Sequence, residues 1–185
     1  MSANWDLRLG CPSDARSIAA LHADSWRRHY RGAYSDAFLD GDVLVDRLAV
    51  WTDRLGLRDS GSCTILAEDE SGLIGFAHTV FDEDPTWGAL LENIHVAHPH
   101  QRRGVGSALL ARTVAAVAAG HRRTGLYLWV LEQNLEAQAF YEVRGARRVE
   151  RAPVAPPGGV PGRLAGSPHR LRYAWDDPSV LVRGL

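Results

Sequence analysis

The stretch that decides the fold is LLENIHVAHPHQRRGVGSALLARTVAAVAAG, residues 90–120. The apolar run at its start is broken at His98-Pro99, which predicts a buried strand. The residues expected to be buried in this strand are Leu90, Leu91, Ile94 and Val96. The segment from Ser107 to Ala119 contains no helix breaker and predicts a helix that ends near Gly120. Its apolar face is formed by Leu110, Val114 and Val117.

Between the predicted strand and helix lies the sequence Gln101-Arg102-Arg103-Gly104-Val105-Gly106. Glycines let the backbone turn tightly and approach a ligand without a Cβ in the way. The first turn of a helix presents N–H groups without partners and a partial positive charge, which suits an anion such as pyrophosphate. This junction therefore predicts a phosphate-binding cradle.

The cradle does not match the two commonest nucleotide-binding loops. The chain has no lysine, so all 21 of its basic residues are arginine. A Walker-type loop needs a lysine after its last glycine, whereas Ser107 follows Gly106. The third glycine of the dinucleotide-binding fingerprint is also absent. A Walker-type ATP or GTP site is therefore excluded.

Length and composition predict one soluble domain that spans residues 1–185. The net charge of −1 gives no reason to expect nucleic acid as a partner. No apolar run is long enough to span a bilayer, and residues 1–6 lack the features of a signal peptide. We therefore expect a cytoplasmic protein that is not bound to a membrane.

Hydrophobic periodicity predicts an α/β domain with a mixed sheet. The expected elements are a strand at Trp5–Leu9, a helix from about Ser13 to His29, a helical stretch at Ser35–Leu57 interrupted near Gly41, strands at Cys63–Ala67, Leu73–Phe81 and Gly88–Val96, the helix at Ser107–Ala119, a strand at Thr124–Leu131, a helix at Asn134–Arg144, and strands at Arg147–Ala152 and His169–Trp175. The segment 153–168 is rich in Pro and Gly, and we expect it to be a mobile loop.

Two blocks of sequence together resemble the GNAT superfamily of acetyl-CoA-dependent N-acetyltransferases. The first is Gln101-Arg102-Arg103-Gly104-Val105-Gly106, which matches the family pattern [Gln/Arg]-x-x-Gly-x-[Gly/Ala] at a strand-to-helix junction. The second is Asn134 followed by Phe140-Tyr141 and Gly145. The aromatic segment 25–34 also resembles the first helix of many members. The resemblance implies the family's acyltransferase fold, a mostly antiparallel sheet of about six to seven strands flanked by about four helices.

The resemblance implies that acetyl-CoA is the cosubstrate and that no metal is needed. The residues expected to bind acetyl-CoA are Ile94, His95, Val96, Gln101, Arg102, Arg103, Gly104, Val105, Gly106, Ser107 and Asn134. In the family the pantetheine arm lies along the central strand and uses its main-chain groups, as in strand addition. For Asn134, a role as helix N-cap explains the residue equally well. His95, His98 and His100 also suggest a metal site, but no carboxylate or cysteine spacing accompanies them.

The family usually transfers the acetyl group by direct attack of the amine. Tyr141 matches the tyrosine that serves as general acid in many members, although a half-buried helix tyrosine would fit the pattern too. Glu92 and His95 are the candidates for the general base. On a regular strand they face opposite sides of the sheet unless a bulge intervenes. His95 has the more suitable ordinary pKa, and Leu90 occupies a position where a family carboxylate base, if present, is found.

The acceptor, a small amine or a peptide amine, is expected to enter between residues 26–39 and the loop 153–168. Trp26, Tyr30, Tyr34 and Trp129 are the aromatic residues expected to contact it. Asp24, Asp36 and Asp40 would attract a cationic amine. A homodimer is compatible with the resemblance. Two other classes stay open at this point: a non-catalytic acyl-CoA-binding sensor or interaction module of the same fold, and a nucleotide- or phosphosugar-binding protein, against which the missing lysine and the second block argue.

Overall fold

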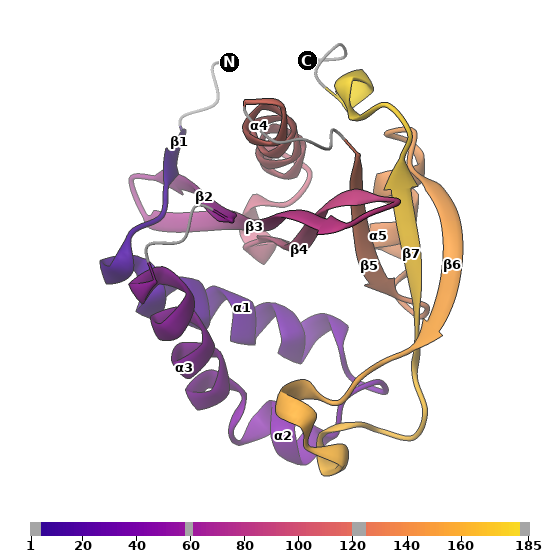
Figure 1. The fold of residues 1–185 in the computed structure, drawn as a ribbon. Coiled ribbons are helices and arrows are strands. Elements are labelled where there is room, and N and C mark those ends of the chain that lie inside the picture. Colours follow the sequence, from indigo (N-terminus) through magenta and orange to yellow (C-terminus); the bar gives the residue numbers. More distant parts are fainter. Residues whose placement is uncertain (1–4, 58–60, 120–124, 182–185) are drawn as a thin grey trace.

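A computed structural model describes residues 5–57, 61–119 and 125–181. The expected helix end at Gly120 and strand start at Thr124 lie outside these ranges. The fold is built on a seven-stranded sheet with the order β1-β2-β3-β4-β5-β7-β6 (Figure 1). Its strands are β1 (Asp6–Leu9), β2 (Ser62–Asp69), β3 (Gly72–Asp84), β4 (Gly88–Val96), β5 (Leu126–Leu131), β6 (Arg147–Pro153) and β7 (His169–Trp175). The predicted mixed sheet is confirmed, since only β4 and β5 pair in parallel.

Helices cover both faces of the sheet, because each strand at its centre has apolar side chains on both sides. The α-helices are α1 (Ala15–His29), α2 (Asp36–Asp40), α3 (Val43–Gly56), α4 (Val105–Ala118) and α5 (Leu135–Glu142). In Figure 1, α4 lies on one side of the sheet and α1 with α3 on the other. The core on the α4 side also contains Tyr141 of α5, so α4 and α5 share that side. The predicted apolar face of α4 is buried, with Val117 only 1% exposed.

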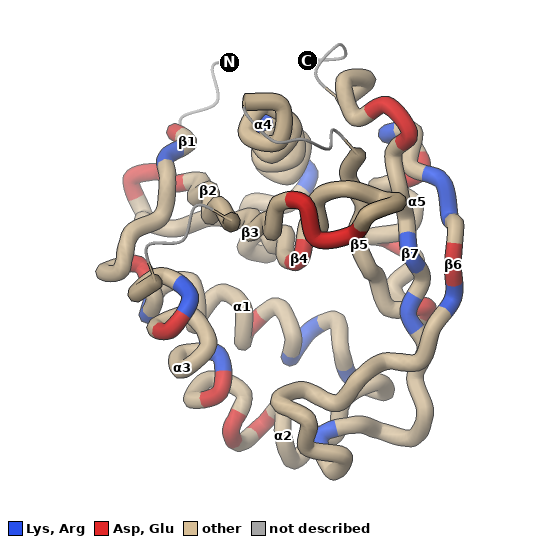
Figure 2. Tube along the Cα trace, in the orientation of Figure 1, with Lys and Arg blue, Asp and Glu red and all other residues tan. Residues whose placement is uncertain are grey.

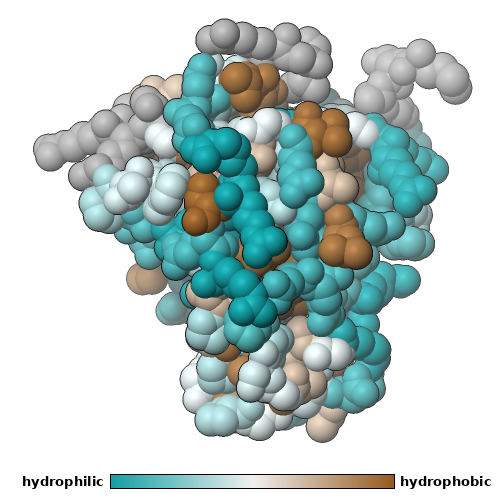
Figure 3. All heavy atoms as spheres, turned by 90° about the vertical axis from the view of Figure 1, so that its right-hand side faces the viewer, coloured by the Kyte–Doolittle hydropathy of each residue, from teal (hydrophilic) through white to brown (hydrophobic). Residues whose placement is uncertain are grey.

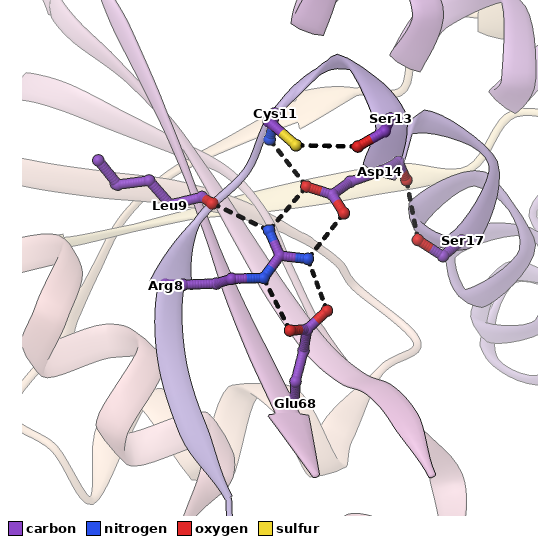
Figure 4. A network of polar contacts seen from close by, with 7 residues as sticks. All are labelled: Arg8, Leu9, Cys11, Ser13, Asp14, Ser17 and Glu68. Carbon is purple, nitrogen blue, oxygen red and sulfur yellow. Dashed lines mark hydrogen bonds and ion pairs between the residues drawn. The ribbon is translucent and has the colours of Figure 1, made fainter. Parts of the chain in front are cut away.

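The two edges of the sheet are charged. The β6 edge carries the exposed arginines Arg147, Arg148 and Arg151 (Figures 2 and 3), and β6 ends at Pro153. Charged side chains and proline on an edge strand oppose pairing with another chain. The opposite edge, β1, is held by Arg8, which donates to Asp14 and Glu68 (Figure 4). This network ties β1 to the start of α1 and to β2.

The segment 153–168, which the sequence predicts to be a mobile loop, packs against α2. The N–H of Ser35 donates to the carbonyl of Arg163, and the N–H of Ala165 donates to the carbonyl of Ala33, both at 2.9 Å. The guanidinium of Arg163 pairs with Asp46 and lies 4.5 Å from the ring centroid of Phe38. These contacts join the loop to residues 33–38, so the two segments between which the acceptor is expected to enter are in direct contact there.

Candidate active site

The site begins where β4 and β5 separate. These strands pair only at Ala89 with Leu126 and at Leu90 with Tyr127, and beyond this point no pairing joins them. The opening leads into a cleft of about 590 Å³. Its walls are residues 91–96 of β4, residues 128–130 of β5, the start of α4, one face of α5 and the end of α1. The main chain of β4 is thus left with an edge that faces the cleft.

The cradle lies at one end of this cleft and has the expected backbone geometry. Gly104 precedes α4 with φ 87° and ψ −11°, a conformation that residues with a Cβ rarely adopt. Arg102 also has a positive φ of 60°. Gly106 packs closely, since a Cβ there would lie 3.4 Å from the ring of Phe140. The first N–H groups of α4 have no partners within the helix and are therefore available to an anion.

Most of the expected cofactor-binding residues line the cleft. They are Ile94, His95, Val96, Gln101, Arg102, Gly104, Gly106, Ser107 and Asn134. Val105 does not, because it is only 1% exposed and packs in the core. Arg103 is exposed outside the cleft lining. Asn134 is the N-cap of α5, because its Oδ1 accepts from the N–H of Ala137 at 3.1 Å, and its side chain still reaches the cleft.

Arg144 is a cleft residue that the sequence reasoning missed. Its guanidinium lies 3.7 Å from the ring centroid of Phe140 and donates to Ser107 Oγ at 2.6 Å. A second hydrogen bond goes to the carbonyl of Phe140, 2.9 Å away. Burial lowers the pKa of this arginine. The sequence held one indication of this role, because Arg144 directly precedes Gly145, the glycine that ends the second block. Arg144 thereby brings a positive charge from the end of α5 to the first turn of α4.

Tyr141 lies in the cleft between the core and the open edge of β4. Its side chain is 7% exposed and packs against the rings of Phe140 and Trp175. Burial raises the pKa of Tyr141 above its ordinary value, and the nearby phenol of Tyr30 raises it further. The hydroxyl is therefore protonated throughout the physiological pH range.

Glu92 and His95 face the same side of the sheet because a bulge separates them. His78 of β3 pairs with Asn93 and the next residue, Thr79, pairs with Leu91, so Glu92 is an extra residue in β4. As a result, Glu92 Oε1 accepts from Arg54 of α3 at 2.6 Å.

His95 is held on the same side by α1 and is a weaker base than its residue type suggests. Its Nδ1 lies 2.8 Å from Ser25 Oγ, and its ring is 4.6 Å from the buried ring of His22. Burial, with smaller contributions from His29 and Arg47, lowers the pKa of His95 to about 3. The ordinary pKa of histidine therefore does not support His95 as the general base. Ser25 and His29 line the cleft beside it and were not among the expected site residues.

Of the four aromatic residues expected to contact the acceptor, Tyr30 and Trp129 line the cleft. Trp26 and Tyr34 do not, and their exposures of 6% and 8% place them in a core cluster with Phe38. The segment is rich in aromatic residues because it fills this cluster, in which the ring of Trp26 stacks on that of Tyr30.

The acidic residues expected to attract a cationic amine are paired with arginine. Asp24 accepts from Arg28 at 2.8 Å. Asp36 and Asp40 both accept from Arg31, at 2.7 Å and 2.5 Å. Their charge is therefore largely compensated. The part of the chain that the structure describes contains no group of three or more His, Cys, Asp or Glu placed to hold a metal. In that same part, no helix is long and apolar enough to cross a membrane.

A sheet that opens between two parallel strands, with a glycine cradle at the mouth, defines an acyl-CoA transferase type of fold. A sequence profile of the acetyltransferase (GNAT) family matches residues 20–146. The uncharacterized N-acetyltransferase YuaI of Bacillus subtilis is 30% identical over 139 residues, which cover 74% of this chain and 76% of that protein. The probable N-acetyltransferase Rv2775 of Mycobacterium tuberculosis is 28% identical over 144 residues, covering 75% and 78%. The chain belongs to the GNAT acetyltransferase family and is an N-acetyltransferase.

Solved structures agree on the fold. The PaiA N-acetyltransferase of Thermoplasma acidophilum superposes with a TM-score of 0.71 at 17% identity, covering 94% of this chain and 100% of that one. NAA60 of Arabidopsis thaliana gives a TM-score of 0.66 at 17% identity, with coverage of 92% and 97%. At this identity the likeness concerns the fold alone.

Proposed function

We propose that the protein transfers the acetyl group of acetyl-CoA to a primary amine by direct attack of the amine nitrogen on the thioester carbon. One observation carries the proposal: a single cleft is lined by the glycine cradle, by the open edge of β4 and by Tyr141. These are a phosphate site, a site for an extended amide chain and a proton donor. The Thermoplasma acidophilum neighbour was solved in complex with coenzyme A, and the Arabidopsis thaliana neighbour with a bisubstrate analogue.

In this proposal the pyrophosphate binds at the N-terminus of α4. The backbone amides of residues 102–107 donate to it, and the side chains of Gln101 and Arg102, which line the cleft, add further donors. Arg144 donates to Ser107 in the first turn of α4, so its positive charge also lies near the proposed pyrophosphate site. The pantetheine amides run along Ile94, His95 and Val96, where β5 has moved away. The Nδ2 of Asn134 is the group left for the ligand, because Oδ1 caps α5.

The proposed chemistry needs one proton donor and one proton acceptor. The amine lone pair forms the new C–N bond, and the C–S bond electrons leave with sulfur as a thiolate. Tyr141 gives its phenolic proton to that thiolate. Its raised pKa keeps the phenol loaded with a proton before the reaction.

For the proton of the amine we propose Glu92 rather than His95. The carboxylate of Glu92 lies at the cleft on the same side as His95, as a result of the bulge. It is ion-paired with Arg54, which orients it. The lowered pKa of His95 makes the imidazole a poor acceptor, so its proposed role is to bind the acceptor or the pantetheine through its ring and Ser25.

The test is the substitution Tyr141→Phe, measured by thiol release from acetyl-CoA across a panel of amines. General acid catalysis contributes roughly 100- to 10,000-fold, so we expect kcat to fall at least about 100-fold. The rise in Tm caused by acetyl-CoA should stay unchanged, because the cradle is untouched.

The matched control is Tyr173→Phe. Tyr173 is another buried core tyrosine, its ring 6.3 Å from that of Tyr141, and its hydroxyl bonds to Glu142 outside the cleft lining. Acetyl transfer that is unchanged in Tyr141→Phe would refute the acid role. If the wild-type protein binds acetyl-CoA but no amine of the panel causes thiol release, the result would instead support the non-catalytic sensor.

A further inference from the structure

On the face of the sheet covered by α1, α2 and α3, here called the acceptor face, several carboxylates are paired with arginines. Figure 2 shows acidic and basic residues side by side along these helices. The compensated carboxylates on the surrounding elements are Asp24, Asp36, Asp40, Asp46, Glu92 and Glu132. Positive charges on an acceptor other than the reacting amine, which Glu92 is proposed to deprotonate, would have to displace an arginine to reach the other carboxylates of this set. The acceptor face is therefore not built for a polycation.

Arg170 of β7 is the contrasting residue. Its guanidinium lies 4.2 Å from the ring centroid of Trp129, a residue that lines the cleft. The Nε of Arg170 is buried and has no hydrogen-bond partner. Within the described part of the chain, no carboxylate lies within ion-pair distance of this guanidinium. A buried donor without a partner is costly and rare in folded proteins, so it needs an explanation.

Arg170 does not itself line the cleft, and Trp129, on which its guanidinium stacks, connects it to the cleft. Leu128 and Val130 of β5 point into the core on the α4 side, so Trp129 between them points to the acceptor face. Arg170 pairs with Leu131, which packs with the residues of α1 and α2. Arg170 and Trp129 therefore lie on the same face, on neighbouring strands.

The neighbouring arginine does not explain this arrangement. Arg172 also lies over Trp129, at 4.7 Å, and its buried Nε likewise makes no hydrogen bond. It differs from Arg170 in its ion pairs, because its guanidinium lies 3.0 Å from a carboxylate oxygen of both Asp84 and Glu150. These carboxylates serve Arg172, whereas Arg170 has none. Burial and the charge of Arg172 lower the pKa of Arg170, against smaller opposite effects of Tyr34, Glu150 and Tyr127.

We propose that Arg170 binds an anionic group of the acceptor, and that the acceptor is an amine that also carries a carboxylate. A guanidinium offers a planar fork that matches a carboxylate with two parallel hydrogen bonds. Trp129 holds the guanidinium in place and forms the surface between it and the cleft. This inference rests on the proposed acetyl transfer to an amine and names the class of its substrate.

The experiment compares pairs of amines that differ only in a carboxylate or a carboxamide, such as 5-aminopentanoate with 5-aminopentanamide and phenylalanine with phenylalaninamide. The variant is Arg170→Gln, and kcat and KM are measured for each amine. Loss of a hydrogen-bonded ion pair should lower kcat/KM for the carboxylate member by roughly 10- to 100-fold, mainly through KM. The carboxamide member should be unaffected, and Arg170→Lys should recover part of the loss.

For each amine, the kcat/KM of the wild type is divided by the kcat/KM of the variant. This ratio is independent of the basicity of the amine. The matched control is Arg28→Gln, an exposed arginine of α1 that pairs with Asp24, and it should leave every ratio at one. An equal loss for both members would show that Arg170 only supports Trp129, and it would overturn the inference, as would no loss at all. If the wild type acetylates amines without favouring carboxylates, only this inference fails. If no amine of the panel causes the wild type to release thiol, the proposed function fails.

Discussion

The backbone conformation of Gly104 gives the sharpest test of the cradle. We consider the substitution Gly104→Ala. A Cβ at this position would meet no heavy atom within 4 Å, so no steric clash contributes to the cost. The remaining cost is the conformational strain of an alanine backbone held at a φ of 87°. A left-handed conformation costs a residue with a Cβ about 1–2 kcal/mol. For a domain of this size, that lowers Tm by about 2–8 °C.

The same substitution should also weaken acetyl-CoA binding. Rotation of Gly104 out of the left-handed region would relieve the strain, but it would turn the first amides of α4 away from the cradle. We therefore expect a smaller rise in Tm with acetyl-CoA, measured by differential scanning fluorimetry over a concentration series.

Gly159 provides a matched control for Gly104. Its φ is 71°, a Cβ there would also meet nothing within 4 Å, and it lies in the loop far from α4 in the sequence. Gly159→Ala should lower Tm by a similar amount and leave the effect of acetyl-CoA unchanged. A Gly104→Ala protein with wild-type stability, or one that binds acetyl-CoA as the wild type does, would refute this account of the cradle.

Two further predictions concern Asp14 and Arg144. The hydrogen bonds from Arg8 hold the pKa of Asp14 at about 2, so this carboxylate stabilises the fold by about 2 kcal/mol above pH 4, and the contribution is lost as the pH falls from about 4 through 2. Asp14→Asn should flatten the pH dependence of the unfolding free energy between about pH 4 and 2, measured by urea denaturation. The control is Asp176→Asn at an exposed site, and an equal effect of this control would contradict the prediction. Arg144→Met should weaken acetyl-CoA binding roughly 10-fold in calorimetry while keeping the contact with Phe140, and an unchanged Kd would place the phosphate elsewhere.

The local parts of the site could be predicted because they depend on neighbours in sequence. The strand, the glycine junction and the helix of residues 88–118 follow from apolar periodicity and from two glycines, and the structure confirms each element. Asn134 sits where an N-cap is expected, and its side chain accepts from a residue three positions later. Contacts of this kind need no knowledge of the rest of the fold.

The acceptor side could not be predicted, because its contacts join residues far apart in the chain. Glu92 faces Arg54 only because β3 and β4 pair with a bulge, and periodicity does not reveal which residue is extra. The low pKa of His95 comes from burial between α1 and β4. Trp26 and Tyr34 resemble ligand-contacting aromatics in sequence, yet packing on Phe38 turns them into core.

The sequence by itself therefore determined the half of the cleft that is proposed to bind the donor: a cradle of glycines and helix amides, a strand beside it and a tyrosine near its end. The tertiary structure decided which groups remain free around the acceptor. With 21 arginines and 22 acidic residues in the chain, many pairings are equally compatible with the sequence. Folding pairs many of the carboxylates around the acceptor face with arginines and, among the described residues, leaves Arg170 without a carboxylate at ion-pair distance, because ion pairs form only between the groups that packing brings within reach.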